Sequence, residues 1–203
     1  MAKKQSRADV QRLTLLALLA AVMVILSSTP LGYLNIGPLA ITLNVIPMGI
    51  AAAALGPTGG AVVGAIFGLT SFLQCIGVGG TSAMGVITFG ISPLLTFIQR
   101  FLPRLLAGLL VGLIHRFLVK KIGKKTACFI TGFLAAFLNT VFFMSALVLL
   151  FGNTDYLQEL IAGRNIIVFI CTFVGINAVS EMVASTLITG AIGSALYKAK
   201  AIK

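Results

Sequence analysis

The segment from Ile166 to Tyr197 constrains the fold more than any other part of this chain. It consists of apolar, small and hydroxylated residues around a single charged side chain, Glu181, and is longer than a membrane is thick. Asn177 lies four residues before Glu181, so both side chains point to the same face of a helix. Because a carboxylate facing lipid is costly, we expect Glu181 to face protein, a ligand or a water-filled cavity.

A glutamate in this position fits two roles. It can be a structural residue that pairs with another helix, or it can take part in the function of the protein. The second role is favoured, because ionisable residues inside a membrane usually mark substrate or ion pathways. The rest of the chain must then supply the cavity that Glu181 faces.

The composition of the chain excludes a soluble protein. Of its 203 residues 59% are hydrophobic and only 9% are charged, which is more apolar surface than one core can bury. The net charge of +11 would suggest nucleic acid in a soluble protein, but here the basic residues cluster at the ends of apolar runs. We therefore predict a multi-pass membrane protein whose basic residues set its topology and contact anionic lipid, without a nucleic-acid partner.

Residues typical of enzymes and metal sites are scarce. The cysteines Cys75, Cys128 and Cys171 stand alone in apolar surroundings, so we interpret them as buried hydrophobic residues. His115 lies beside a basic cluster at a helix end, which favours an interfacial position over a catalytic one. The run Gly123 to Thr126 lacks the earlier glycine of a phosphate-binding loop. We predict neither an enzyme nor a metal or nucleotide site.

Periodic apolar runs predict an all-α membrane protein with six transmembrane helices in a single domain, residues 1–203. Pro47 and Pro103 leave the starts of the second and fourth helices open, because proline interrupts the hydrogen bonds of a helix. The predicted helices are Leu13 to Leu26, Leu39 or Val45 to Leu55, Gly60 to Cys75, Pro93 or Arg104 to Val119, Ala127 to Phe151, and Ile166 to Lys198.

The distribution of basic residues predicts the orientation. They gather before the first helix, between the fourth and fifth helices, and after the sixth. The positive-inside rule places these three positions in the cytoplasm, with residues 1–12 and 199–203 as basic tails. The connections at 30–45, 76–92 and 152–163 then lie on the outer side. We expect the first to fold over a cavity mouth and the second, uncharged and rich in glycine, to be a re-entrant or lid-like loop.

Polar residues within the helices are candidates for contact with a ligand. Asn139 lies in the middle of the fifth helix and is expected to line the same outward-facing cavity as Asn177 and Glu181. Arg100 and Arg104, four residues apart, either reach the membrane surface or act inside the bundle, where they face the cavity or brace Glu181. Gln74 fits a ligand contact as well as a cap or packing role. The candidate substrate-binding residues are Asn139, Asn177, Glu181, Arg100, Arg104, Gln74 and Asn44.

Small residues recur at a spacing of four in several helices. Glycine occupies every fourth position from Gly56 to Gly68, and Gly108 and Gly112 repeat the spacing. Ala17 and Ala21 do the same in the first helix. This spacing brings helices into close contact, so we interpret the glycine stripe as a packing feature.

Several motifs, taken in their order over almost the whole chain, resemble the substrate-binding S component of an energy-coupling factor (ECF) vitamin transporter. The resemblance implies a six-helix protein that captures a vitamin at the outer side of a bacterial plasma membrane. It would dock through Ala17 and Ala21 on a scaffold subunit with two ATPases, which use ATP, so the chain itself would need no cofactor. The motifs are Ala17-xxx-Ala21, Gly56-Pro57-Thr58-Gly59, Pro103 to Gly108, Asn139-Thr140 and Asn177-xxx-Glu181.

The resemblance is greatest to pantothenate-type members, in segments 36–42 and 67–72. An arginine at 100 or 104 suits the carboxylate of pantothenate. Riboflavin is the alternative ligand, although an aromatic content of 8% without tryptophan offers few surfaces for stacking. A stand-alone secondary transporter would show internal repeats, of which we find no convincing example.

Overall fold

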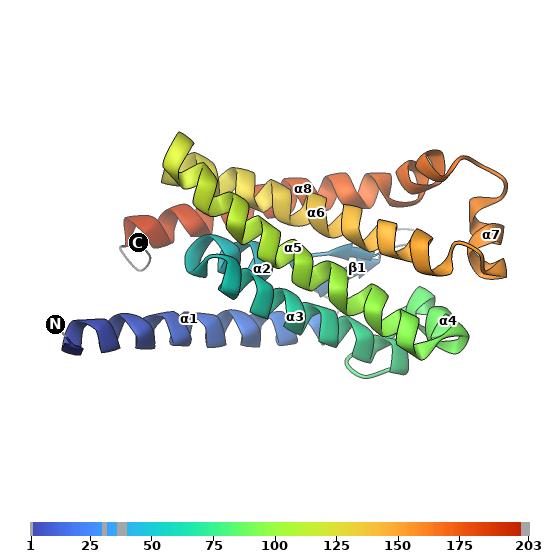
Figure 1. Cartoon of the computed structure of the whole chain (residues 1–203), viewed down its shortest axis with the longest axis horizontal. Coiled ribbons are helices and arrows are strands. Elements are labelled where there is room, and N and C mark those ends of the chain that lie inside the picture. Colours follow the sequence, from blue (N-terminus) through green and yellow to red (C-terminus); the bar gives the residue numbers. More distant parts are fainter. Residues whose placement is uncertain (1, 30–31, 36–39, 200–203) are drawn as a thin grey trace.

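The computed structural model describes residues 2–29, 32–35 and 40–199. Its long helices lie roughly side by side along one axis (Figure 1). The elements are α1 (Ala2–Ser27), β1 (Tyr33–Asn35), β2 (Ala40–Thr42), α2 (Val45–Leu55), α3 (Pro57–Leu73), the 3-10 turn η2 (Gln74–Ile76), α4 (Ala83–Ile91), α5 (Pro93–Ile122), α6 (Lys124–Phe151), α7 (Asp155–Ile161) and α8 (Ile166–Lys198).

The fold is nearly all helical, as the sequence predicts. Among the described residues, five segments are long and apolar enough to cross a membrane, and they lie in α1, α3 with η2, α5, α6 and α8. The remaining predicted helix, the second in chain order, is α2, which has only 11 residues. The predicted N-terminal tail, residues 1–12, belongs to α1 from Ala2 onward. Of the predicted C-terminal tail, residues 200–203 lie outside the described part of the chain.

The structure decides between the alternative helix starts at the two prolines. α2 begins at Val45, so Pro47 lies in its first turn, where the backbone N–H has no acceptor within the helix. α5 begins at Pro93 and continues through Pro103, so the alternative start at Arg104 is wrong. The Ser92 hydroxyl caps α5 by accepting a hydrogen bond from the Leu95 N–H at 3.4 Å.

The connections contain more regular structure than predicted. The expected glycine-rich loop at 76–92 includes α4, and the Ser82 hydroxyl caps this helix by accepting from the Gly85 N–H at 3.2 Å. The connection at 152–163 includes α7, which Thr154 caps. The connection at 30–45 contains an antiparallel pair of strands in which Tyr33 pairs with Thr42. This hairpin is an addition to the predicted all-α fold.

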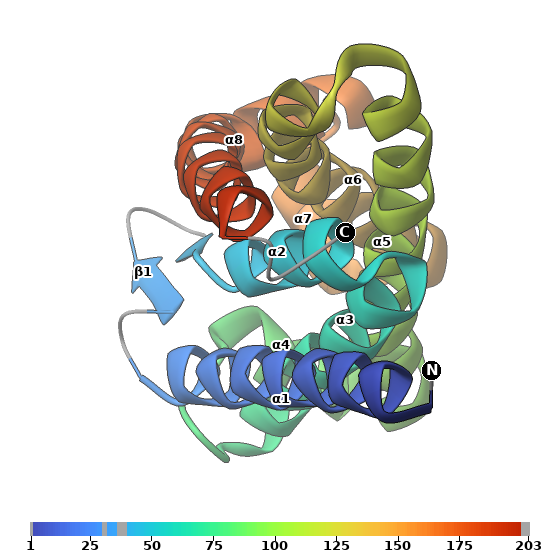
Figure 2. The same cartoon turned by 90° about the vertical axis from the view of Figure 1, so that its left-hand side faces the viewer.

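The two ends of the bundle differ in what they carry (Figure 1). The start of α1, the turn between α5 and α6 and the end of α8 lie at one end, which we call the basic end because these are the three predicted basic positions. α4 and α7 lie at the other end. Viewed from the basic end, α1 lies at the side of the bundle, next to α2 and α3 and away from α6 and α8 (Figure 2).

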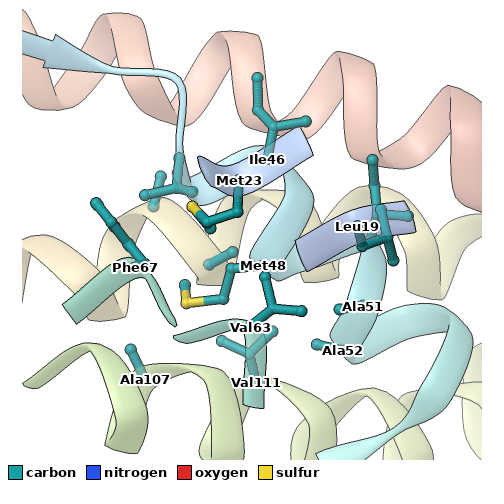
Figure 3. Close-up of a cluster of buried hydrophobic side chains, with 14 residues drawn as sticks. Leu19, Met23, Ile46, Met48, Ala51, Ala52, Val63, Phe67, Ala107 and Val111 are labelled. Carbon is teal, nitrogen blue, oxygen red and sulfur yellow. The ribbon is translucent and has the colours of Figure 1, made fainter. Parts of the chain in front are cut away.

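The core of the bundle is built around α2. All residues of this helix except Ala54 are buried, which is typical of a helix that is apolar on every side. Met48 of α2 lies among side chains from α1 and α3, including Met23 and Phe67 (Figure 3). A second apolar cluster holds α7 against α6 and α8 through residues such as Leu157 and Phe169.

The predicted packing role of the glycine stripe is confirmed. A side chain at Gly60 would overlap the carbonyl oxygen of Gly108 on α5, and one at Gly108 would overlap the carbonyl oxygen of Gly60. A side chain at Gly64 would overlap the carbonyl oxygen of Arg104. The backbones of α3 and α5 therefore touch directly, and this contact sets the position of the α5 segment that carries the two arginines.

Candidate substrate-binding site

A cavity of about 100 Å³ lies between the hairpin, α5, α6 and α8. Five of the predicted ligand residues, from three different helices, meet in its lining. The first and the last of them, Arg100 and Glu181, are 81 positions apart in the sequence. The described lining residues are Thr42, Ser82, Arg100, Arg104, Asn139, Thr140, Phe143, Met144, Val174, Asn177 and Glu181.

Glu181 faces protein and the cavity, as expected, rather than lipid. Its side chain is 7% exposed, and its Oε1 atom accepts a hydrogen bond from the backbone N–H of Thr42 at 2.5 Å. This bond ties β2 to α8. Arg104 lies close enough to act on Glu181 electrostatically. Asn177, one turn earlier on α8, is also buried and lines the same cavity.

The two arginines are buried in the bundle, which decides between their two predicted roles. Each is 5% exposed, so neither reaches the membrane surface. Arg100 donates hydrogen bonds to the hydroxyls of Ser71 at 3.4 Å and Ser82 at 3.2 Å. Arg104 donates to the backbone oxygen of Arg100 at 2.6 Å. These hydrogen bonds to neutral acceptors help to hold the guanidinium groups in place in the cavity lining.

Aromatic rings add to the support of the guanidinium groups. The ring centroid of Phe143 lies 5.3 Å from Cζ of Arg100 and 4.9 Å from Cζ of Arg104. The ring of Phe67 lies 4.4 Å from Cζ of Arg104. All three distances are typical of cation–π contacts, which stabilise a buried arginine without neutralising it.

The cavity combines positive charge with an open hydrogen-bond acceptor. Its described lining contains two guanidinium groups and one carboxylate, so the positive charge is in excess. Asn139 is 7% exposed, and within the described structure its Oδ1 atom accepts no hydrogen bond. A buried polar atom of this kind is costly unless a ligand or water binds it. The arrangement suits a small anionic molecule that also carries hydrogen-bond donors.

The family model of the ECF transporter, substrate-specific component, matches residues 11–193. The chain belongs to this family. It is therefore a multi-pass membrane protein that binds a small-molecule substrate for uptake and works with an ECF scaffold and ATPase modules; it is not an enzyme. A comparison with curated proteins finds no significant match.

The site of this S component includes residues that the sequence analysis did not select. Phe143 lies one helical turn after Asn139, so the spacing of four was the signal that could have found it. Thr42 and Ser82 come from connections, and the sequence gives no indication of which connection residue approaches the helices. Their contributions depend on the tertiary fold.

Two of the predicted ligand residues lie elsewhere in the S component. Gln74 is buried in η2, and its Nε2 atom donates a hydrogen bond to the backbone oxygen of Ser27 at 2.6 Å. It therefore connects the end of α1 to the end of α3. Asn44 is fully buried at the start of α2, where its side chain makes no cap hydrogen bond. Neither residue is part of the described cavity lining.

The Gln74 contact leads to a first testable prediction. Gln74→Met keeps the length of the side chain but leaves the Ser27 oxygen without this donor. We expect the free energy of unfolding to fall by about 1–3 kcal/mol, while substrate affinity stays within about twofold of wild type. Thermal unfolding and calorimetric titration of the purified variant measure the two quantities. A large loss of affinity without a loss of stability would instead make Gln74 a ligand residue.

A separate polar cluster lies at the basic end. His115 is 3% exposed, and its ring nitrogens lie 2.7 Å from the Thr131 hydroxyl and 3.0 Å from the Tyr197 hydroxyl. Thr131 donates its own proton to the Ala127 oxygen, so it accepts from Nδ1 of His115. In the neutral ring, Nε2 then accepts from Tyr197. The cluster is internally satisfied and holds α5, α6 and α8 together, so His115 is buried between helices near the basic end.

The cysteines differ in their surroundings. Cys75 and Cys128 are buried, as predicted, whereas Cys171 is exposed on α8, so that part of the prediction is wrong. Position 171 lies on the outward face of α8, where an apolar thiol can face lipid. Within the part of the chain that the structure describes, no three His, Cys, Asp or Glu residues lie close enough together to bind a metal ion.

Proposed function

We propose that this S component captures an anionic, water-soluble vitamin, with pantothenate favoured, from the outer side of a bacterial plasma membrane. The observation that carries the proposal is the pair of buried guanidinium groups, Arg100 and Arg104, in a cavity whose described lining holds one carboxylate. The two guanidinium groups and the single carboxylate give this lining a net positive charge, which favours an anionic ligand.

Pantothenate matches the other groups of the cavity. Its carboxylate can pair with one or both arginines, which bind carboxylates through two parallel hydrogen bonds. Its hydroxyl groups and its amide N–H are donors for the Asn139 oxygen and the Glu181 carboxylate, and its amide oxygen suits the amide N–H₂ group of Asn177. A cavity of about 100 Å³ is smaller than most ligand pockets, so the hairpin or the helices must move apart when a vitamin enters.

Riboflavin fits the cavity less well. A flat ring system binds best against an aromatic face, and Phe143 is the one aromatic residue of the described lining. Its ring already contacts both guanidinium groups. The predicted similarity to pantothenate-type members also covers residues 36–39, which lie outside the described residues, so the cavity supplies the support for the proposal.

The proposed orientation and partners follow from the two ends of the bundle. We place the basic end in the cytoplasm by the positive-inside rule, with both termini there and α4 and α7 outside. In this orientation residues 1–203 act as one substrate-binding domain. Ala17 and Ala21 are exposed on α1 and offer a surface of small residues for the transmembrane scaffold, whose two ATPases supply the energy.

A calorimetric binding panel tests the proposal. The purified S component in detergent is titrated with pantothenate, riboflavin and other water-soluble vitamins. We expect submicromolar affinity for pantothenate, weakened roughly fivefold by Asn139→Ala, which removes one neutral hydrogen bond. Asn153→Ala, in the exposed turn after α6, is the matched control and should bind like wild type. Tight binding of riboflavin or of an uncharged vitamin in place of pantothenate would contradict the proposal.

A further inference from the structure

A second polar pocket lies at the basic end, far from the vitamin cavity along the helices. Its volume is about 290 Å³, and it is formed by α1, the turn between α2 and α3, the end of α5 and the end of α8. Figure 2 looks onto this end of the bundle. Three cationic side chains, Arg12, Arg116 and Lys120, are among its described lining residues, which include no carboxylate. The pocket therefore attracts anions.

The two arginines of this pocket are held at the same turn. Arg12 donates a hydrogen bond to the backbone oxygen of Leu55, the last residue of α2, at 3.4 Å. The Arg116 guanidinium packs on Gly56, since a Cβ atom there would lie 3.0 Å from its Nε atom. Gly56 has a φ of 77°, a backbone conformation that residues other than glycine rarely adopt. The turn thus brings cations from α1 and α5 together.

An apolar groove continues from this pocket along α1. Its volume is about 350 Å³, and it shares Arg12 and Leu55 with the basic pocket. Leu13 and Val62 line it and are 68% and 42% exposed. Asp9 is the one carboxylate of its described lining and lies on the far side of the shared Arg12 along α1. A cationic pocket followed by an apolar groove fits a molecule with an anionic head and a hydrocarbon chain.

The depth of the pocket in the membrane agrees with this chemistry. Arg12 lies three residues after the start of the candidate span Asp9–Ser27, and Lys120 lies two residues before the end of the span Pro93–Ile122. The cations therefore lie at the level of the lipid headgroups, and the groove extends into the hydrocarbon region. Basic pockets between transmembrane helices at this level bind the headgroups of anionic lipids.

We propose that this pocket binds the phosphate of an anionic glycerophospholipid, with one acyl chain in the groove beside α1. The bound lipid would bridge α1 and α5 across the turn between α2 and α3. The site is separate from the vitamin cavity and does not depend on which vitamin the S component binds.

Lipid retention in nanodiscs tests this proposal. The S component is reconstituted in equal amounts of phosphatidylglycerol and phosphatidylcholine, and native mass spectrometry counts the lipids that stay bound after release. We expect wild type to retain phosphatidylglycerol about tenfold over phosphatidylcholine. Arg116→Gln/Lys120→Gln should abolish this preference. Lys121→Gln/Lys125→Gln, which removes the same charge from exposed residues outside the pocket, should keep it.

Three results would overturn the proposal. The first is a wild type without preference for phosphatidylglycerol, a result that needs no variant to fold. The second is an equal loss in both double variants, which would mean a diffuse attraction of the whole basic end. The third is displacement of the lipid by millimolar inorganic phosphate, which would mean that the pocket binds a free anion and that the groove contributes nothing.

Discussion

Replacement of Arg104 with glutamine is expected to weaken binding of an anionic vitamin about 100-fold, which corresponds to about 2.7 kcal/mol. The Arg104 side chain is 5% exposed in the cavity lining, so its charge acts on a ligand with little screening by water. Glutamine keeps a donor of similar length but has no charge. Calorimetric titration with pantothenate measures the change, and Lys121→Gln at the exposed end of the same helix controls for net charge.

Arg104 also acts on Glu181, so its effect on the ligand must be separated from its effect on that carboxylate. The double variant Arg104→Gln/Glu181→Gln makes this separation, because it removes both charges together. If Arg104 binds the ligand, the double variant stays as weak as Arg104→Gln. Recovery of affinity in the double variant would show that Arg104 only neutralises Glu181. The role proposed for Arg104 would then be wrong.

The largest loss of stability is expected where α3 and α5 touch. Gly60→Val or Gly108→Val places a branched side chain against a backbone oxygen, which cannot move aside without separating the helices. We expect each substitution to lower the free energy of unfolding by about 3 kcal/mol, or the midpoint of thermal unfolding by roughly 5–10 °C. Thermal unfolding followed by size-exclusion chromatography measures this loss in detergent.

A matched glycine outside the contact controls for helix propensity. Gly90 lies in α4 with no atom within 4 Å of the position of a Cβ, so Gly90→Ala should leave the unfolding midpoint unchanged or slightly raised. The variants at the contact should also bind the vitamin more weakly, because Gly64, on the same stripe, packs on the backbone of Arg104. Normal stability in Gly60→Val would mean that α3 and α5 are less closely packed than the structure has them.

The sequence predicted those parts of the fold whose physical cause is local. Glycine at every fourth position can mark only one face of a helix, and that face makes the predicted contact. Glu181 could be placed in the interior because a carboxylate in lipid is costly, and it lies there. α8 has the bounds that its apolar run indicated, Ile166 to Lys198.

The remaining parts depend on packing that no single segment encodes. The spacing of Arg100 and Arg104 gives their common face but not their depth, so their burial required the structure. Gln74 is as polar as Asn139, yet it bonds to the end of α1 and not to the cavity. The hairpin and α4 are short and rich in turn residues, and their positions follow from contacts such as that of Thr42 with Glu181.

The short length of α2 bears on how the ligand specificity of such a protein can change during evolution. Eleven helical residues span about 16 Å, roughly half of a bilayer, and α2 is packed against α5, α6 and α8. The same three helices continue past its start at Val45 and surround the cavity there, together with the hairpin. The substrate would thus occupy the volume that a helix long enough to span the whole bilayer would fill. Insertions or substitutions between residues 30 and 45 could therefore reshape the ligand volume during evolution while the α3–α5 contact and the core around α2 stay unchanged.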